Sequence, residues 1–370
     1  MSKAADLANL IGNINAGGGG VNRNLIINGA MNVSQRGTSF SFSNNAYCLD
    51  RIMTSLGNNS GAATVTQDSS APEGFANSLK VNVTTADSSL ATNHYNQMVY
   101  RIEAQNLQSL AFGTSEAKNI TLSFYVKSNK TGTYSVNIAQ NDNSYKQANL
   151  TYTIDSANTW ERKSLTFTGD TSGVINDDNG HGLEIVWILA AGTTYSSGNN
   201  SASFVTYADA NYAANQGVNV FDTIGNTWFL TGMQLEIGQN ATTFEHEPYE
   251  TTLRKCQRYL LRYPNDGGTN GGYTRYGTGQ IVASNEAEIS IYPPVHMRVD
   301  PSLSIGGSAS DYYIWNANDA DSCSALSVEG GSTHEYIVVN VVGANMTAGR
   351  GCMLNAYGNS TNFLEFDAEL

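Results

Sequence analysis

The tripeptide Glu245-His246-Glu247 is the closest approach to an acid–base cluster in this sequence. A glycosidase uses two carboxylates that converge about 5 to 10 Å apart. In an extended segment Glu245 and Glu247 share one face while His246 points to the other. The tripeptide follows the last strand of an alternating apolar pattern, so we interpret it as structural. We accordingly expect the protein not to be an enzyme.

The signatures of other reactive sites are missing from the sequence. It contains no GxSxG, HExxH or Walker loop, and no GxGxxG followed by a helical pattern. The glycine run at 17–20 has no Lys-Ser/Thr behind it, so it is not a phosphate loop. The five histidines are dispersed and lack metal-binding spacing.

An oxygen-rich turn at Asp177-Asp178-Asn179-Gly180 has the composition of a calcium ligand loop. Calcium takes about six to eight oxygen ligands, so further carboxylates, such as Asp155 or Asp170, would have to converge on it. A plain turn is our preferred interpretation, and a structural calcium at Asp177 and Asp178 is the alternative. No other cofactor is expected.

Aromatic clusters are the stronger functional signal. Sugars place their C–H faces on flat rings, while amide and hydroxyl side chains meet the sugar hydroxyls. Core or subunit-interface packing is the alternative use of such rings. The candidate glycan contacts are two tyrosines of a long central loop, Tyr207 and Tyr212, which Tyr195 accompanies, and five residues near the C-terminus: Tyr273, Tyr276, Tyr312, Tyr313 and Trp315.

The four cysteines are widely spaced and form no CxxC motif, so we expect buried free thiols. Cys323 and Cys352, both in a strand-rich tail, are the one pair expected to face each other.

The composition excludes several classes of function. Lys and Arg number 19 against 32 Asp and Glu, which gives a net charge of −13, and only 14% of the 370 residues are charged. Nucleic-acid binding needs a clustered basic surface, which this acidic chain lacks. No apolar run approaches the roughly 20 residues of a membrane span, so no membrane insertion is expected. The first sixteen residues do not resemble a secretory signal.

Strict alternation of apolar and polar residues predicts many short β-strands. Ile120, Leu122, Phe124 and Val126 give one clear example. Strands at intervals of ten to twenty residues, with little helical periodicity between them, predict an all-β fold: an antiparallel jelly-roll sandwich. The same pattern appears around 79–83, 98–102, 134–138, 165–167, 185–189 and 229–237.

Two segments interrupt the strand pattern. Residues 192–225 form a long Gly, Asn and Ser-rich loop in this interpretation. Residues 249–263 predict a connecting helix, because Glu250 precedes Arg254 and Lys255 in the order that the helix dipole favours.

A smaller β domain is expected after that helix. Its closing carboxylates, Glu365, Asp367 and Glu369, alternate with apolar residues and predict a solvated strand face. The predicted organisation is therefore an N-terminal anchoring or assembly peptide at 1–20, a sandwich at 21–248, the helix at 249–263 and a C-terminal β domain at 264–370. The N-terminal peptide carries an apolar stripe suited to docking or to a frayed terminus: Leu7, Leu10, Ile11 and Ile14.

Three stretches resemble a module of bacteriophage tail-fibre and other virion appendage proteins. They are Asn24–Gly37 with Tyr47–Arg51, then Leu122–Ser128 with Trp160-Glu161, then Trp228–Gly238 with Ala241–Glu245. This module is similar to carbohydrate-binding jelly rolls. The helix Leu253–Tyr259 and the closing Phe366–Leu370 resemble the C-terminal part of the same proteins.

The resemblance implies a structural protein of the virion, typically a homotrimer, assembled in the host cytoplasm. We expect a tail fibre or fibre-like appendage that attaches to other virion proteins through its N-terminus and contacts host-surface polysaccharide. A capsid decoration or head-fibre protein is the alternative, and a glycan-degrading enzyme is a weaker one.

Overall fold

The computed structural model describes residues 3–4, 23–58, 60–142, 145–265, 273–316, 319–357 and 361–370. β-Strands dominate these residues, which confirms the predicted all-β class. The chain divides into two compact units, one formed by the residues up to Thr252 together with Leu370 and the other by Leu253–Glu369. The apolar stripe Leu7, Leu10, Ile11 and Ile14 lies outside the described residues.

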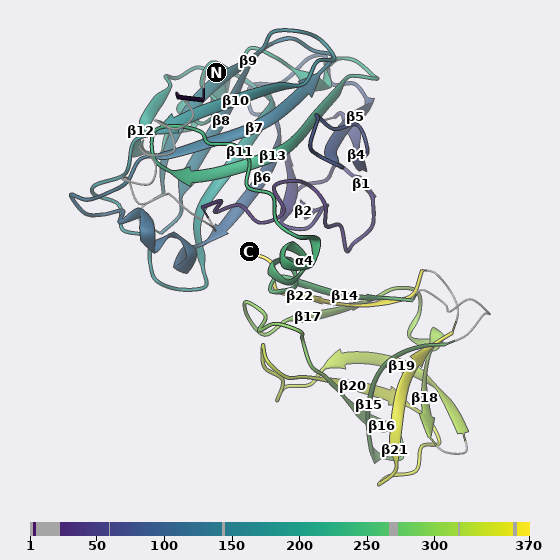
Figure 1. Ribbon diagram of the computed structural model, residues 1–370. Coiled ribbons are helices and arrows are strands. Elements are labelled where there is room, and N and C mark those ends of the chain that lie inside the picture. The colour runs from purple at the N-terminus through teal and green to yellow at the C-terminus, as the bar shows by residue number, and fades with distance from the viewer. Residues whose placement is uncertain are drawn as a thin grey trace. The chain divides into compact units, whose positions relative to one another are not determined.

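Unit 1 is an antiparallel sandwich of two sheets, as the alternating pattern predicted (Figure 1). In the described residues, the six-stranded sheet has the order β1 (Ser39–Ser41), β4 (Ala62–Asp68), β5 (Ser78–Thr85), β13 (Thr227–Ile237), β7 (Ile120–Ser128) and β10 (Glu161–Phe167). The seven-stranded sheet has the order β12 (Ser201–Thr206), β9 (Lys146–Ile154), β8 (Gly132–Gln140), β11 (His181–Ala191), β6 (Tyr95–Glu103), β3 (Ile52–Gly57) and β2 (Ala46–Tyr47).

The inward faces of the two sheets form one hydrophobic core. Phe124 of β7 meets Trp187 of β11 edge to face with ring centroids 5.9 Å apart, and both side chains are fully buried. Tyr152 of β9, which is in the same sheet as Trp187, also packs on Phe124, with ring centroids 5.1 Å apart. Each such aromatic side chain removes a large apolar area from water, which is the main term that stabilises the sandwich.

The segment at 192–225 is not the plain loop that its composition predicted. It contains α2 (Thr193–Ser196), β12, α3 (Asp209–Tyr212) and the short 3₁₀ helix η2 (Val220–Asp222). Tyr212 and Ala213 pack on Met53, Val99 and Val186, which project from the outer face of the seven-stranded sheet. The apolar outer face explains the difference, because it gives this polar segment a surface on which to fold. A second 3₁₀ helix, η1 (Ala104–Leu110), follows β6.

Unit 2 combines a small sheet and a barrel, each counted over the described residues. The three-stranded sheet has the order β14 (Leu260–Pro264), β22 (Phe363–Asp367) and β17 (Ser302–Ile305). The closed barrel has the order β15 (Thr274–Ala283), β16 (Glu286–Ile291), β20 (Ile337–Gly343), β19 (Asp319–Val328), β18 (Tyr312–Asn316) and β21 (Gly351–Ala356), and the 3₁₀ helix η3 (Ala309–Asp311) precedes β18.

The predicted helix at 249–263 is too long. Helix α4 spans Tyr249–Gln257, and Leu260–Pro264 form β14, in which Leu261 pairs with Phe366 of β22. Leu260 and Leu261 are both buried, so they gain more from sheet pairing and the unit 2 core than from extending a short helix.

The predicted solvated face on the last strand is wrong at Glu365, whereas Asp367 and Glu369 are partly exposed. Glu365 is 8% exposed and its carboxylate lies 3.0 Å from the Arg262 guanidinium on the paired strand. β22 is the central strand of its sheet, so Arg262 can compensate the buried charge from the neighbouring strand.

All four cysteines are free and buried, as predicted. Among the described residues, no helix is long and apolar enough to cross a membrane.

Candidate functional site

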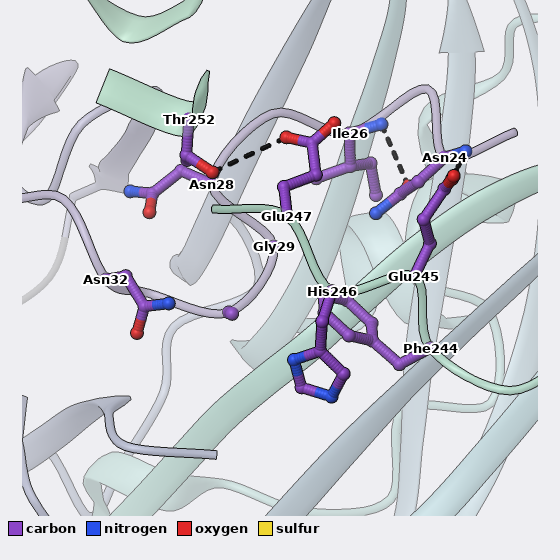
Figure 2. A pocket seen from close by; sticks show the side chains of 11 residues that line it. Asn24, Ile26, Asn28, Gly29, Asn32, Phe244, Glu245, His246, Glu247 and Thr252 are labelled. Atoms are coloured by element: carbon purple, nitrogen blue, oxygen red, sulfur yellow. Dashed lines mark hydrogen bonds between the residues drawn. The ribbon is translucent and has the colours of Figure 1, made fainter. Parts of the chain in front are cut away.

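The cluster Glu245-His246-Glu247 surrounds a very small cavity in unit 1 (Figure 2). Glu245 accepts a hydrogen bond from the Asn24 N–H at 3.0 Å, and Glu247 accepts one from the Thr252 hydroxyl at 3.4 Å. The cavity of about 20 Å³ has room for about one water molecule and excludes a sugar ring. These carboxylates therefore tie chain segments together at this point.

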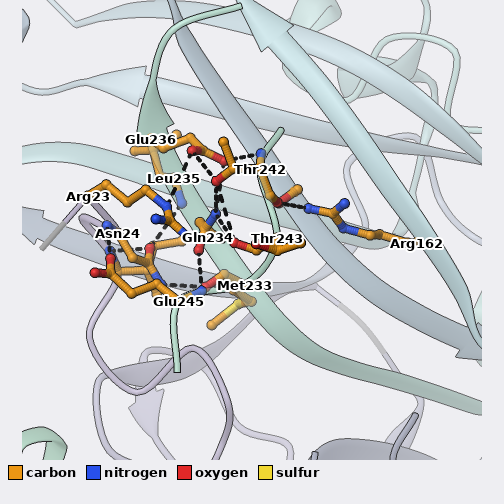
Figure 3. Close-up of polar contacts among 12 residues, drawn as sticks. Arg23, Asn24, Arg162, Met233, Gln234, Leu235, Glu236, Thr242, Thr243 and Glu245 are labelled. Carbon is orange, nitrogen blue, oxygen red and sulfur yellow. Dashed lines mark hydrogen bonds and ion pairs between the residues drawn. The ribbon is translucent and has the colours of Figure 1, made fainter. Parts of the chain in front are cut away.

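A buried polar network next to this cavity fixes the end of the sandwich (Figure 3). Glu236 is fully buried, and its carboxylate accepts hydrogen bonds from the Thr242 N–H at 2.8 Å, the Thr242 hydroxyl at 2.7 Å and the Gln234 amide at 2.9 Å. Arg162 of β10 donates to the Thr242 carbonyl. Charge-assisted bonds of this kind satisfy a carboxylate that could not otherwise be buried, so the network has a structural role.

The two carboxylates that could complete a calcium site with the acidic turn, Asp155 and Asp170, are bound by lysines instead. Asp178 accepts a hydrogen bond from the Gly180 N–H at 2.8 Å, while Asp170 is held by Lys146 at 3.0 Å and Asp155 by Lys163 at 3.1 Å. In the part of the chain that the structure describes, no three His, Cys, Asp or Glu side chains are arranged to hold a metal ion. Calcium at Asp177 and Asp178 stays a prediction that rests on the turn alone.

A larger groove lies on the outer face of the seven-stranded sheet, and we call it the sheet groove. It arises from strand alternation: Met98 and Tyr100 of β6 fill the core, so Gln97, Val99 and Arg101 project outward. Its volume is about 250 Å³, close to the lower end of small-molecule sites. The lining residues are Asn45, Ser55, Gln97, Val99, Arg101, Asn141, Tyr145, His181, Glu184 and Tyr212.

Tyrosines from two separate segments form an aromatic wall at this groove. Tyr145 and Tyr207 meet edge to face with ring centroids 4.9 Å apart, and the ring centroids of Tyr207 and Tyr212 lie 6.1 Å apart. The Tyr207 hydroxyl donates to Asp209 at 2.8 Å, which fixes its ring. Burial raises the pKa of Tyr145 to about 12, so its hydroxyl stays protonated and can both donate and accept. The sequence prediction for Tyr207 and Tyr212 thus corresponds to one real cluster, in which Tyr212 lines the groove.

The floor of the sheet groove is polar and partly unsatisfied. Gln97 is only 6% exposed, yet its Oε1 atom has no hydrogen-bond partner among the described residues. The Nε2 atom of His181 is buried and equally without one there. Burial and the Arg101 charge lower the pKa of His181 to about 4, so the ring is neutral at pH 7. The Gln97 side chain also hydrogen-bonds with Tyr212. Two buried, uncharged polar atoms at the groove thus have no hydrogen-bond partner among the described residues.

Unit 2 separates the C-terminal aromatic residues into two sets. Tyr312 is fully buried inside the barrel, with its hydroxyl 2.7 Å from the Phe363 carbonyl oxygen, and Tyr276 is 8% exposed beside it. The prediction that Tyr276 and Tyr312 contact glycan is therefore wrong, because both side chains belong to the core.

The second set lies on the outer face of the barrel. Tyr273 lies 4.4 Å from Trp315 and 4.6 Å from Tyr357, and Tyr313 lies 5.6 Å from Tyr357, measured between ring centroids. Tyr273, Tyr313 and Trp315 are thus brought together as predicted. Tyr357 was missed, since it stands alone in a stretch without aromatic neighbours.

No model of a known protein family matches the chain, and no curated protein matches it either. Among solved structures, the chain is similar to the enzymatically active domain of tailspike protein 4 of bacteriophage CBA120, with a TM-score of 0.32 and 12% identity over 58% of this chain. The match spans 21% of that protein, about a fifth of its length.

Two further solved structures are similar over most of their own length. One is a family 11 carbohydrate-binding module of a cellulosomal cellulase from Clostridium thermocellum, with a TM-score of 0.29 and 15% identity over 55% of this chain and 95% of that one. The other is a putative sugar binding protein from Bacteroides thetaiotaomicron, with a TM-score of 0.33 and 13% identity over 58% of this chain and 99% of that one. At these TM-scores the likenesses carry no argument about what this chain binds.

Proposed function

We propose that this protein binds carbohydrate in the sheet groove of unit 1. The observation that carries the proposal is the position of Gln97, which lines the groove with Tyr145 and Tyr212 and whose Oε1 has no hydrogen-bond partner among the described residues. A buried amide oxygen without a partner is costly, and a sugar hydroxyl supplies the missing donor. The rings offer flat faces to the C–H surface of the same sugar.

The charge of the groove favours a neutral or weakly charged sugar. Arg101 is held by Glu184 at 2.9 Å, and His181 is neutral at pH 7. The whole chain carries a net charge of −13, which repels polyanions.

The test is a binding measurement on the full chain with an array of neutral oligosaccharides. We expect Gln97→Ala to weaken the best ligand roughly tenfold, because one hydrogen bond to a desolvated amide contributes about 1.4 kcal/mol. Gln280→Ala, at an exposed glutamine of β15, is the matched control and should leave affinity unchanged. Equal affinity for Gln97→Ala and the wild type would remove the support for this site.

We propose further that the protein is a bacteriophage structural protein, a trimeric tail fibre or fibre-like appendage that carries this site to host-surface polysaccharide. The support is the resemblance at 24–37, 122–128 and 228–245, together with a low-charge surface rich in Asn, Ser and Thr. Immunogold labelling of intact particles tests the location, and sedimentation equilibrium tests the trimer. Labelling spread over the capsid would favour the decoration protein instead.

A further inference from the structure

Unit 2 contains a second groove, on the outer face of the barrel, which we call the barrel groove. Its volume is about 350 Å³, and it is lined by Thr278, Gly279, Trp315, Asn316, Gly351, Cys352 and Met353. Strand register explains how these residues meet: Met353 of β21 lies opposite Thr278 of β15 on one side and Trp315 of β18 on the other. The groove therefore crosses three adjacent strands of a rigid barrel.

One wall of the barrel groove is aromatic. Trp315 is half-buried and meets Tyr273 at 4.4 Å and an angle of 64°, and Tyr273 in turn contacts Tyr357. Tyr273 directly precedes β15 and Tyr357 directly follows β21, and they are 37% and 51% exposed. The Tyr273 hydroxyl donates to the Tyr357 hydroxyl at 3.0 Å, so the two rings hold each other in place.

Two polar atoms on this face have no hydrogen-bond partner among the residues that the structure describes. They are Nε1 of Trp315, a donor, and Oδ1 of Asn355, an acceptor. Leu354 and Ala356 fill the barrel interior, so Asn355 belongs to the outer face, where it lies opposite Tyr313 and is nevertheless 0% exposed. Buried polar atoms normally find partners. Of these two residues Trp315 lines the groove, so a ligand there can supply the acceptor that its Nε1 lacks, whereas Asn355 does not line it.

The chemistry of the barrel groove selects the ligand. None of its seven lining residues is charged, and the chain is strongly acidic, so an anionic ligand has no counter-charge there. A second copy of the chain also offers donors and acceptors, and the oligomeric state of Gly351→Leu distinguishes it from a sugar. Sugar hydroxyls accept as well as donate, so one can accept from Trp315 Nε1, and sugar C–H faces match the Trp315 ring.

We propose that the barrel groove is a second carbohydrate site, which takes a neutral saccharide stacked on Trp315. This second site goes beyond the proposed function, because it is on a different unit from the sheet groove and is formed by different residues. The protein would then hold glycan through two independent sites in one chain.

Gly351 allows a steric test that leaves the rings intact. The nearest atom to a Cβ added there is the Gly279 carbonyl oxygen at 4.0 Å, so Gly351→Leu starts a side chain in the groove without a Cβ clash. Gly330→Leu, in a turn of the same unit with open space around it, is the matched control. Trp315→Ala removes the stacking ring, and Tyr292→Ala removes a 70% exposed tyrosine elsewhere on unit 2 as its control.

The measurement is titration calorimetry of the full chain carrying Gln97→Ala, against neutral gluco-, manno-, galacto- and xylo-oligosaccharides. We expect at least one to bind, and Gly351→Leu and Trp315→Ala to weaken it roughly tenfold or more, while both controls stay within about twofold. Binding unaffected by both groove variants would overturn the proposal, as would no binding to any of the four sugars in this background. A changed oligomeric state in Gly351→Leu would overturn it too, because the groove would then be a contact between copies. Failure of the proposed sheet-groove site is a separate result. In that case Gln97→Ala alone would bind the sugar with the affinity of the wild type.

Discussion

Arg101 of β6 and Glu184 of β11 are register partners on adjacent strands, and the guanidinium Nε lies 2.9 Å from the carboxylate. Both project from the outer face of the seven-stranded sheet and line the sheet groove. The Glu184 side chain is 9% exposed and the Arg101 side chain 27%, so the pair is partly desolvated. The two charges compensate each other in one wall of the groove, and Arg101 also donates to the Leu370 carbonyl oxygen at 2.8 Å.

Removing one partner of this pair should destabilise unit 1. Arg101→Gln leaves the Glu184 carboxylate with less compensation, and we expect a loss of about 1 to 3 kcal/mol in the free energy of unfolding, less than for a fully buried pair because Arg101 is partly solvated. Urea unfolding measures it. Asp155→Asn, at a 70% exposed carboxylate 3.1 Å from Lys163, is the control and should cost under about 1 kcal/mol. Equal losses of stability in Arg101→Gln and the control would mean that the Arg101–Glu184 pair stabilises unit 1 no more than an exposed ion pair does.

His181 should make the fold sensitive to mild acid. Its pKa is about 4 in the folded protein, against about 6.5 in an unfolded chain. Between these values the unfolded chain binds the extra proton, so stability falls as pH falls from about 6.5 to 4, by up to about 3 kcal/mol.

His181→Gln should remove this part of the pH dependence, whereas His246→Gln, at an exposed histidine, should not. Guanidinium unfolding at four pH values between 4.5 and 7.5 gives the slopes. Parallel curves for His181→Gln and the wild type would show that His181 is protonated equally in both states.

The network around Glu236 predicts a measurable cost for losing one hydroxyl. Thr242→Val keeps the shape of the side chain but removes the 2.7 Å bond to the buried carboxylate. We expect a loss of about 1.5 to 3 kcal/mol, the range for a hydrogen bond to a charged group. Thermal unfolding measures the loss, and Thr243→Val, at the exposed neighbouring residue, is the control. If Thr242→Val left the free energy of unfolding unchanged, the Glu236 carboxylate would have to be protonated or solvated.

The buried thiols should be unreactive in the native protein. Burial raises the pKa of Cys48 and Cys323 to about 12 and that of Cys352 to about 11, so little thiolate forms at pH 8. A thiol reagent should therefore label native protein slowly, and four thiols per chain promptly after unfolding in guanidinium. Fewer than four after unfolding without reductant would reveal a disulfide.

Alternation predicted most of the sandwich, because strands such as β7 and β13 show their buried face directly in the sequence. It missed β1 to β4, β9 and β12. These strands lie at or next to the edges of the two sheets, where side chains need not be apolar. The unit 1 packing under residues 192–225 was invisible because it depends on an apolar outer face that only the assembled sheet presents.

The candidate sites show the same limit. Tyr312 and Tyr313 are neighbours on one strand, so one had to point into the barrel and one out, but the sequence does not say which. Gln97, Arg101 and Glu184 carried no motif at all. The sheet groove forms where β6 and β11 meet residues from several distant segments, and only strand register brings Arg101 and Glu184 together.

The central claim is that a sugar occupies the sheet groove. A crystal structure of the full chain with the best neutral oligosaccharide from the array tests it most directly. The account predicts a sugar ring within about 4 Å of the Tyr145 or Tyr212 ring, with a hydroxyl donating to Gln97 Oε1 at about 2.8 Å. An empty sheet groove, with the oligosaccharide bound elsewhere on unit 1, would contradict it.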